Sequence, residues 1–160
     1  MSRSEALASN LEERRWILLG DLWPDLIKGA GDHPGIDILP PGPLSLHAQP
    51  HPLSVILGNL LSNAATYAET RVQVRLEREG QSTRLIVEDD GPSVAFSELT
   101  NLGRRFFRAA NARPGGNGLG LSIAQACTRA QGWRMDYARS TLGGLRVDLI
   151  MPATDVGAGV

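Results

Sequence analysis

The run Gly115-Gly116-Asn117-Gly118-Leu119-Gly120-Leu121-Ser122-Ile123-Ala124 leads a glycine cluster directly into an apolar helical pattern. The pattern continues at helical spacing through Leu119, Ile123, Ala126 and Ala130. It predicts a helix from about Gly118 to Gln131. The first backbone N–H groups of a helix lack partners within it and favour an anion, which glycines allow to approach closely. The stretch predicts a phosphate site, although an ordinary glycine-rich loop explains it equally well in isolation.

The composition indicates one globular domain with a proper core. The chain has 160 residues, of which 42% are hydrophobic and 21% charged, and its net charge is −1. This charge gives no basic surface for nucleic acid or for an anionic membrane, so we expect neither partner. Cys127 is the single cysteine and falls in the apolar pattern of the predicted helix, which indicates a buried thiol and no intrachain disulfide.

The N-terminal residues do not resemble a secretory signal, because Glu5, Glu12 and Glu13 fall within them, and no apolar run reaches the length of a membrane span. We therefore expect a soluble, cytoplasmic chain.

Residues 5–19 have the pattern of an amphipathic helix, whereas residues 21–35 contain two prolines and several glycines and predict only a short helical turn and a loop.

The remaining periodicities predict a hairpin of residues 35–39 and 44–48, a helix over 50–68, a hairpin of 71–79 and 84–88, a short helix near 96–102, and strands over 133–138 and 145–151. Hairpin-paired strands with about three helices on one face predict a two-layer α+β sandwich with a mixed, mostly antiparallel sheet. The expected division is a helical stub over 1–20, the main domain over 21–152, and a disordered tail over 153–160.

Three polar residues form a stripe on the predicted helix over 50–68, because Asn59, Asn63 and Tyr67 are spaced four apart. Asparagine is unfavourable inside helices, and burying an unpaired amide costs about 1–3 kcal/mol. The two amides either cap neighbouring backbone groups or have a function. In the functional alternative, the Asn63 oxygen completes the ligand shell of a magnesium ion whose other ligands are phosphates and water.

A second polar cluster ends the strand over 84–88, where Glu88-Asp89-Asp90-Gly91-Pro92-Ser93-Val94 follows. A turn explains this sequence adequately. A carboxylate at a strand end beside a pocket can also accept a hydrogen bond from an exocyclic amine, which would select adenine over guanine. Asp89 is the candidate for this contact.

Together these motifs resemble the catalytic ATP-binding domain of sensor histidine kinases, a member of the superfamily that includes gyrase, Hsp90 and MutL and shares the Bergerat ATP-binding fold. Residues 59–67 resemble the N box, 89–93 the first glycine box, 105–108 the F box and 116–121 the second glycine box. Each box is weak alone, but their order and spacing agree. The resemblance covers roughly residues 22–152.

The resemblance implies that ATP and Mg²⁺ are the cofactors, that Asn63 binds the metal, and that Asn59, Asn63 and Arg108 act in catalysis. Asp89 would hold the adenine amine, while the second glycine box would start the helix beneath the phosphates. The implied nucleotide site comprises Asn59, Asn63, Tyr67, Asp89, Gly91, Ser93, Val94, Phe107, Arg108, Gly116, Gly118, Leu119, Gly120 and Leu121. Arg113 is either a phosphate ligand or a solvated loop charge.

Three positions depart from the family pattern. Ser93 stands where a second glycine is usual, Thr66 where a basic residue often follows the N-box asparagine, and Gly103 where the F box usually has its first phenylalanine. None of them removes the metal or adenine residues, so we expect nucleotide binding to be retained.

The reaction is predicted from Asn59, because the ATPases of the superfamily have a glutamate at this position that activates water. An amide cannot accept a proton near neutral pH, so transfer to another acceptor is favoured over hydrolysis. His33, His47 and His51 do not fit a phosphoacceptor helix, so we expect the acceptor histidine on a separate helical domain of the parent kinase. Residues 1–20 can be the end of one of its dimerisation helices.

The resemblance implies a response regulator as the downstream partner, and it is compatible with a parent protein anchored in the inner membrane. We expect no membrane contact by this domain and a monomer. Two alternatives to the histidine kinase function are left open. The chain is a serine kinase of the anti-sigma type in the first, and a non-catalytic nucleotide-binding module in the second.

Overall fold

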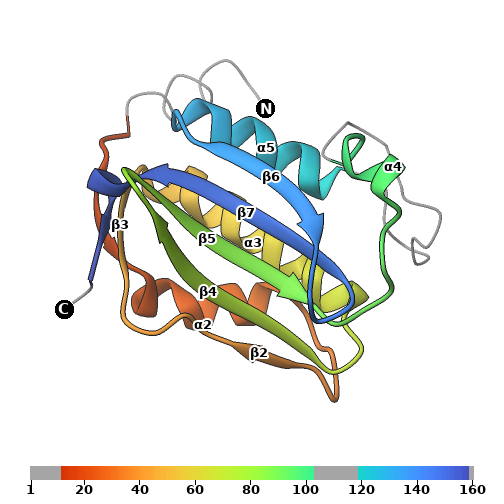
Figure 1. The fold of residues 1–160 in the computed structure, drawn as a ribbon. Helices are drawn as coiled ribbons and strands as arrows, with labels where there is room; N and C mark the ends of the chain where they lie inside the picture. The colour runs from red at the N-terminus through yellow and green to blue at the C-terminus, as the bar shows by residue number, and fades with distance from the viewer. Residues whose placement is uncertain (1–11, 103–118, 159–160) are drawn as a thin grey trace.

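The computed structural model describes residues 12–102 and 119–158, and its main layer is a five-stranded sheet (Figure 1). The strands lie in the order β2 (Asp37–Leu39), β4 (Arg71–Glu79), β5 (Ser82–Asp89), β7 (Leu145–Pro152) and β6 (Arg134–Arg139). The β2–β4 pair is parallel and the other pairs are antiparallel. The predicted mixed, mostly antiparallel sheet is confirmed.

Three helices form the second layer on one face of this sheet: α2 (Leu19–Gly29), α3 (Pro50–Tyr67) and α5 (Gly120–Ala130) (Figure 1). Prolines in its first turn suit the start of α3, where their missing N–H groups have no helical partner. Its buried residues are Leu53, Ile56, Leu57, Leu60, Leu61, Ala64 and Ala65. A fourth helix, α4 (Phe96–Leu99), is a single turn. None of the described helices has the length and apolar character that a membrane span requires.

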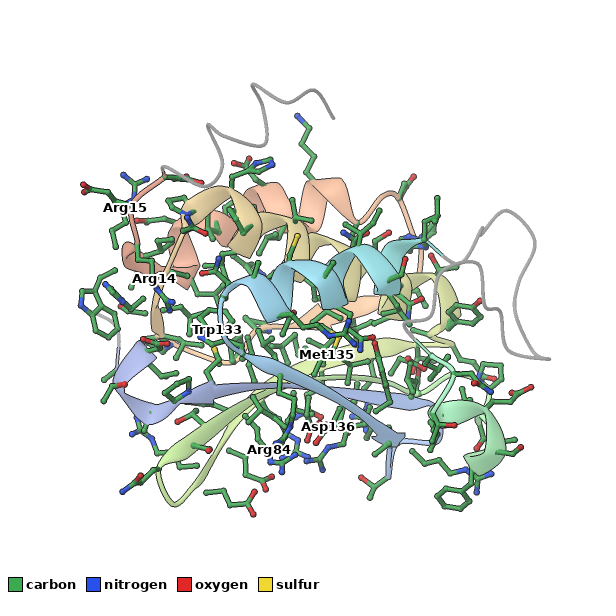
Figure 2. All side chains as sticks on the ribbon, turned by 90° about the horizontal axis from the view of Figure 1, so that it is seen from above. Arg14, Arg15, Arg84, Trp133, Met135 and Asp136 are labelled. Carbon is green, nitrogen blue, oxygen red and sulfur yellow. The ribbon has the colours of Figure 1, made fainter. Side chains whose placement is uncertain are left out.

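The face of the sheet away from the helices is covered by ion pairs. Asp148 is 4% exposed and accepts from Arg84 Nη1 at 2.9 Å and from Arg146 Nε at 2.7 Å. Arg84 also lies 3.9 Å from Asp136 of the edge strand, and both side chains point away from the helical layer (Figure 2). The hydrogen bond to Asp148 raises the pKa of both arginines. This face is therefore charged at its surface and balanced in sign.

A second, three-stranded sheet corrects the prediction of a helical stub, because residues 15–18 form strand β1 (Arg15–Leu18). It pairs antiparallel with β3 (Ser45–Ala48), whose other edge pairs with β8 (Val156–Gly157). Ile17 is buried at 8% exposure opposite Leu46, which is fully buried. Burial against a distant strand decides the conformation here over the local helical period. The part of the stub before residue 12 lies outside the described residues.

A polar cluster connects this small sheet to the ends of two helices. Arg14 donates to the carbonyl oxygens of Gln131 at 3.1 Å and His47 at 3.0 Å, and to Asp155 Oδ2 at 3.0 Å. Trp133 Nε1 donates to the same Asp155 oxygen at 2.9 Å. The Gln131 side chain also donates to Gln49 Oε1 at 2.8 Å, so the end of α5 is joined to the residue before α3.

The predicted hairpin of residues 35–39 and 44–48 is wrong. Strand β2 pairs with β4 in the large sheet, whereas β3 belongs to the small sheet. The intervening Pro40-Pro41-Gly42-Pro43 has only one backbone N–H group, at Gly42, and it carries the chain from one sheet to the other instead of closing a hairpin.

Two further segments are more ordered than predicted. Residues 153–160 were expected to be disordered, but a 3₁₀ turn (Ala153–Asp155) and β8 follow β7, and Val156 is buried at 7% exposure. Burial of Val156, pairing of β8 with β3 and the hydrogen bonds to Asp155 together hold this tail on the core. Likewise α2 is a helix of 11 residues despite Pro24, because Leu19 and Leu26 are buried on it.

Candidate functional site

An acceptor oxygen lies beside the start of α5. Asn59 is half-buried in α3 and donates from Nδ2 to the Val55 carbonyl oxygen at 2.8 Å. Its Oδ1 is directed toward α5, since a Cβ added to Gly120 would stand 3.3 Å from that oxygen. The N-cap residue Leu119 is apolar and supplies no side-chain cap. Backbone N–H donors of the first turn of α5 therefore lie beside the neutral amide oxygen of Asn59. The donors suit a phosphate, and the oxygen suits the cation that accompanies it.

The remaining N-box residues continue along α3. Asn63 and Tyr67 are half-buried and follow Asn59 at intervals of four, which places all three on one stripe of the helix. Thr66 Oγ1 donates to the Ser62 carbonyl oxygen at 2.8 Å, so its hydroxyl bonds back to its own helix. Thr66, the departure from the usual basic residue, thus has a structural partner in α3.

A buried carboxylate ends strand β5. Asp89 is 2% exposed, and its Oδ1 accepts the Gly91 N–H at 2.9 Å. Gly91 lies against the end of α3, because a Cβ at this position would stand 2.0 Å from the Tyr67 carbonyl oxygen. Only glycine fits this contact. The structure therefore brings the first glycine box and the N-box helix together at one corner.

Gly144, in the turn between β6 and β7, forms the other side of this corner and was not predicted as a site residue. Its N–H donates to the Asp89 carbonyl oxygen at 3.1 Å, and an added Cβ would stand 2.0 Å from Asp89 Oδ1. A signal was present in the glycine doublet. Gly143 has a φ of 118°, a backbone conformation that favours glycine, so the turn accounts for it. Gly144 does not have a positive φ, so the turn conformation does not require glycine there. The second glycine indicates a close approach by another group.

The chain after Gly91 forms the next part of the candidate site. Ser93 is exposed, whereas Val94 is buried at 7% exposure and its carbonyl oxygen accepts Arg139 Nε at 2.8 Å. Leu119, Gly120 and Leu121 lie together at the start of α5 and are half-buried. Four predicted site residues, Phe107, Arg108, Gly116 and Gly118, lie outside the described residues, as do Gly103 and Arg113.

Asp90 has a different role from its neighbour Asp89. Its Oδ1 accepts the backbone N–H groups of Glu69 at 2.9 Å, Thr70 at 3.0 Å and Arg71 at 3.2 Å, and its Oδ2 accepts the Thr70 hydroxyl. Burial alone would raise the pKa of the Asp90 carboxyl, but the hydrogen bonds from Thr70, Arg71 and Glu69 outweigh it and hold the pKa well below its usual range. Asp90 thus fixes the connection between α3 and β4.

The donor set at this corner fits a nucleotide with a hard cation. Within residues 12–102 and 119–158, no three His, Cys, Asp or Glu side chains gather as a metal site. Asn59 and Asn63 of α3 supply amide oxygens, and magnesium accepts such ligands together with phosphate and water. The close contacts at Gly91 and Gly144 hold the backbone against a buried carboxylate and fix its position at this corner.

The chain matches a known protein family over most of its length. The family described as histidine kinase-, DNA gyrase B-, and HSP90-like ATPase matches residues 48–155. The sensor histidine kinase CpxA of Escherichia coli K12 is 32% identical over 95% of this chain and 35% of its own length. The sensor protein kinase CarS of Pseudomonas aeruginosa is 36% identical over 74% of this chain and 26% of its own length. The chain thus spans about a third or less of these relatives.

Solved structures agree with this assignment. The mycobacterial sensor histidine kinase MprB has a TM-score of 0.73 and 26% identity, covering 86% of this chain and 97% of that one. The ATP-binding domain of PrrB from Mycobacterium tuberculosis, at 22% identity and a TM-score of 0.67, shares the fold. The chain therefore belongs to the histidine kinase-, DNA gyrase B-, and HSP90-like ATPase family and is a histidine kinase ATP-binding domain.

Proposed function

We propose that this chain binds Mg-ATP between α3, α5 and the Asp89 corner and presents the γ-phosphate to a histidine on a separate helical domain of its parent kinase. The observation that carries the proposal is the position of Asn59 Oδ1 against the glycine start of α5. The phosphate would pass afterwards to an aspartate of a response regulator.

The Asp89 carboxylate would select the base. Oδ1 is held by the Gly91 N–H, and the carboxylate is an acceptor that can receive the exocyclic amine of adenine. Guanine has a carbonyl oxygen at the equivalent position, which an anionic oxygen repels. This arrangement supports adenine nucleotides as the ligand class.

The phosphates would lie over the first turn of α5, where backbone N–H groups and the partial positive charge of the helix favour anions. Asn63 would contribute an oxygen ligand to the metal, and Asn59 would lie beside the phosphates. Magnesium, when bound, would neutralise phosphate charge. The contribution of the protein is mainly to orient the nucleotide and to leave one phosphate accessible to an external acceptor.

Transfer is favoured over hydrolysis, because Asn59 cannot act as a general base. It is an amide, and its Nδ2 is already bonded to the Val55 carbonyl oxygen. The three histidines have other surroundings: His33 bonds the Ala30 carbonyl oxygen at 2.8 Å, His47 lies 3.7 Å from Asp155, and His51 is in the first turn of α3. These positions support an acceptor on another domain.

The test begins with calorimetric titration of the chain with ADP and ATP, with and without magnesium. We expect binding at micromolar to sub-millimolar strength, about −5 to −8 kcal/mol. Asp89→Asn is expected to lose binding, and Asn63→Ala to bind without a magnesium effect. Asp136→Asn, on the far face of the sheet, is the matched control and should bind as the parent chain does.

The second step supplies the histidine-bearing helical domain of the parent kinase in trans with ATP labelled on the γ-phosphate. Label on histidine supports the proposal. Nucleotide binding without transfer would instead favour a nucleotide-sensing module, and label on serine would favour a serine kinase of the anti-sigma type.

A further inference from the structure

We propose that Arg139 is a positioning residue for the base side of the nucleotide site, an inference that rests on the function proposed above. Arg139 is the last residue of β6, and its Nε donates to the Val94 carbonyl oxygen at 2.8 Å. Its guanidinium carbon lies 4.1 Å from the centroid of the Phe96 ring. One side chain thus contacts two residues of the segment that follows the Asp89 corner.

Part of this segment is exposed to solvent. Val94 is buried, but Ala95 is exposed, and the Phe96 side chain is 68% exposed. Helix α4 is a single turn of four residues with no buried residue, and so short a helix is not stable by itself. The contact with Arg139 fixes the entrance to α4 from β6, an element of the rigid sheet.

The turn that follows Arg139 also supports the Asp89 corner. Ser140 Oγ donates to Glu88 Oε2 at 2.8 Å, and Gly144 N donates to the Asp89 carbonyl oxygen at 3.1 Å. The end of β6 and the turn after it therefore contact both Val94 and Asp89. Arg139 holds the Val94 segment relative to the Asp89 corner, and in the function proposed above the base binds between them.

Arginine suits this position because it combines a directed Nε–H donor with a planar cation that stacks on an aromatic ring. Arg134, at the other end of β6, provides a contrast. It is exposed, and it pairs with Asp136 at 3.6 Å on the far side of the sheet. The two arginines of one strand thus form a matched pair for mutation.

The test compares Arg139→Met with Arg139→Gln in ADP titrations. The Gln amide nitrogen occupies the position of Nε along the side chain and keeps the donor, whereas Met keeps length without it. We expect Arg139→Met to weaken ADP binding about threefold to fivefold, and Arg139→Gln to restore it to within about twofold. Arg134→Met should bind as the parent chain does.

Amide hydrogen exchange without nucleotide measures the same anchor independently. We expect faster exchange over residues 94–99 in Arg139→Met and parental exchange in Arg139→Gln, with equal melting temperatures for the two variants. Met and Gln variants that behave alike in both measurements would overturn the inference. A parent chain that fails to bind ADP would contradict the proposed function, while the exchange comparison would still decide the role of Arg139.

Discussion

Asp89 and Gly144 lie in direct contact, so that a Cβ on Gly144 would stand 2.0 Å from Asp89 Oδ1 and 2.7 Å from the Asp89 carbonyl oxygen. These atoms belong to the central strand β5 and to the β6–β7 turn, neither of which can move away without breaking sheet hydrogen bonds. The glycine is thus required by the carboxylate opposite it.

Gly144→Ala is expected to destabilise the chain by about 1–3 kcal/mol, because the added methyl overpacks a rigid corner. ADP affinity should fall at least about tenfold, measured by titration on the folded protein. Gly58→Ala is the control, since no described atom lies within 4 Å of a Cβ there and the residue is inside α3. It should stabilise the chain by about 0.5–1 kcal/mol in urea denaturation. Equal effects of the two substitutions would contradict this account.

Asp90→Asn should lower the free energy of unfolding by about 1 kcal/mol near neutral pH, a modest value because the site is partly solvated. The folded-state pKa of Asp90 is depressed, so its contribution is fully present above the unfolded pKa of about 3.9 and is lost as the pH falls through the lower folded value. The difference between parent and variant, measured by urea denaturation, should therefore shrink on acidification. A difference independent of pH would exclude the ionised carboxylate as its cause.

Asp148→Asn is expected to cost about 3–5 kcal/mol, because Asp148 is buried and two guanidinium groups would lose their shared anionic partner. Asp136→Asn is the matched control. Asp136 pairs in register with Asp148 across the strands, but its side chain is 47% exposed, so its loss should change stability by less than about 0.5 kcal/mol. Chemical denaturation measures the free energy of unfolding of both variants. Similar losses of stability would mean that burial of the aspartate does not determine how much its ion pairs stabilise the chain.

Arg14→Met should destabilise the chain by about 1–2 kcal/mol, since the three acceptors of Arg14 lie on β3, the end of α5 and the 3₁₀ turn. A double-mutant cycle with Asp155→Asn should give a coupling of about 0.5 kcal/mol or more. Strict additivity of the two substitutions would show that the ion pair contributes nothing to folding.

The elements that local rules specify could be predicted from the sequence. The helix α3 follows from prolines at its start and a regular apolar spacing, and the β4–β5 hairpin from strict alternation across a short turn. Strand β1 could not be predicted, because its four residues also fit a helical period and only pairing with β3 makes them extended. The same holds for β8, whose pairing partner is also β3.

The candidate site follows a similar division. Asn59 and Asn63 could be selected because asparagine is unfavourable inside a helix, and Asp89 because a carboxylate at a strand end can accept a hydrogen bond from a base. The glycine doublet indicates a close approach at Gly144 but not its partner in β5, and Arg139 could not be selected, since its role depends on the segment before α4. A contact between distant segments leaves little trace in the composition of either one.

Strand β3 also determines how a mechanical force would travel through the domain. β1 and β8 both run antiparallel to β3, on its two edges, and β3 continues through Gln49 directly into α3. Tension between residues 15 and 157 would therefore shear the hydrogen bonds on both edges of β3 at once, instead of peeling a strand away bond by bond. A pull on the segment before β1 would reach the axis of α3, and with it the amides of Asn59 and Asn63, without passing through a flexible loop.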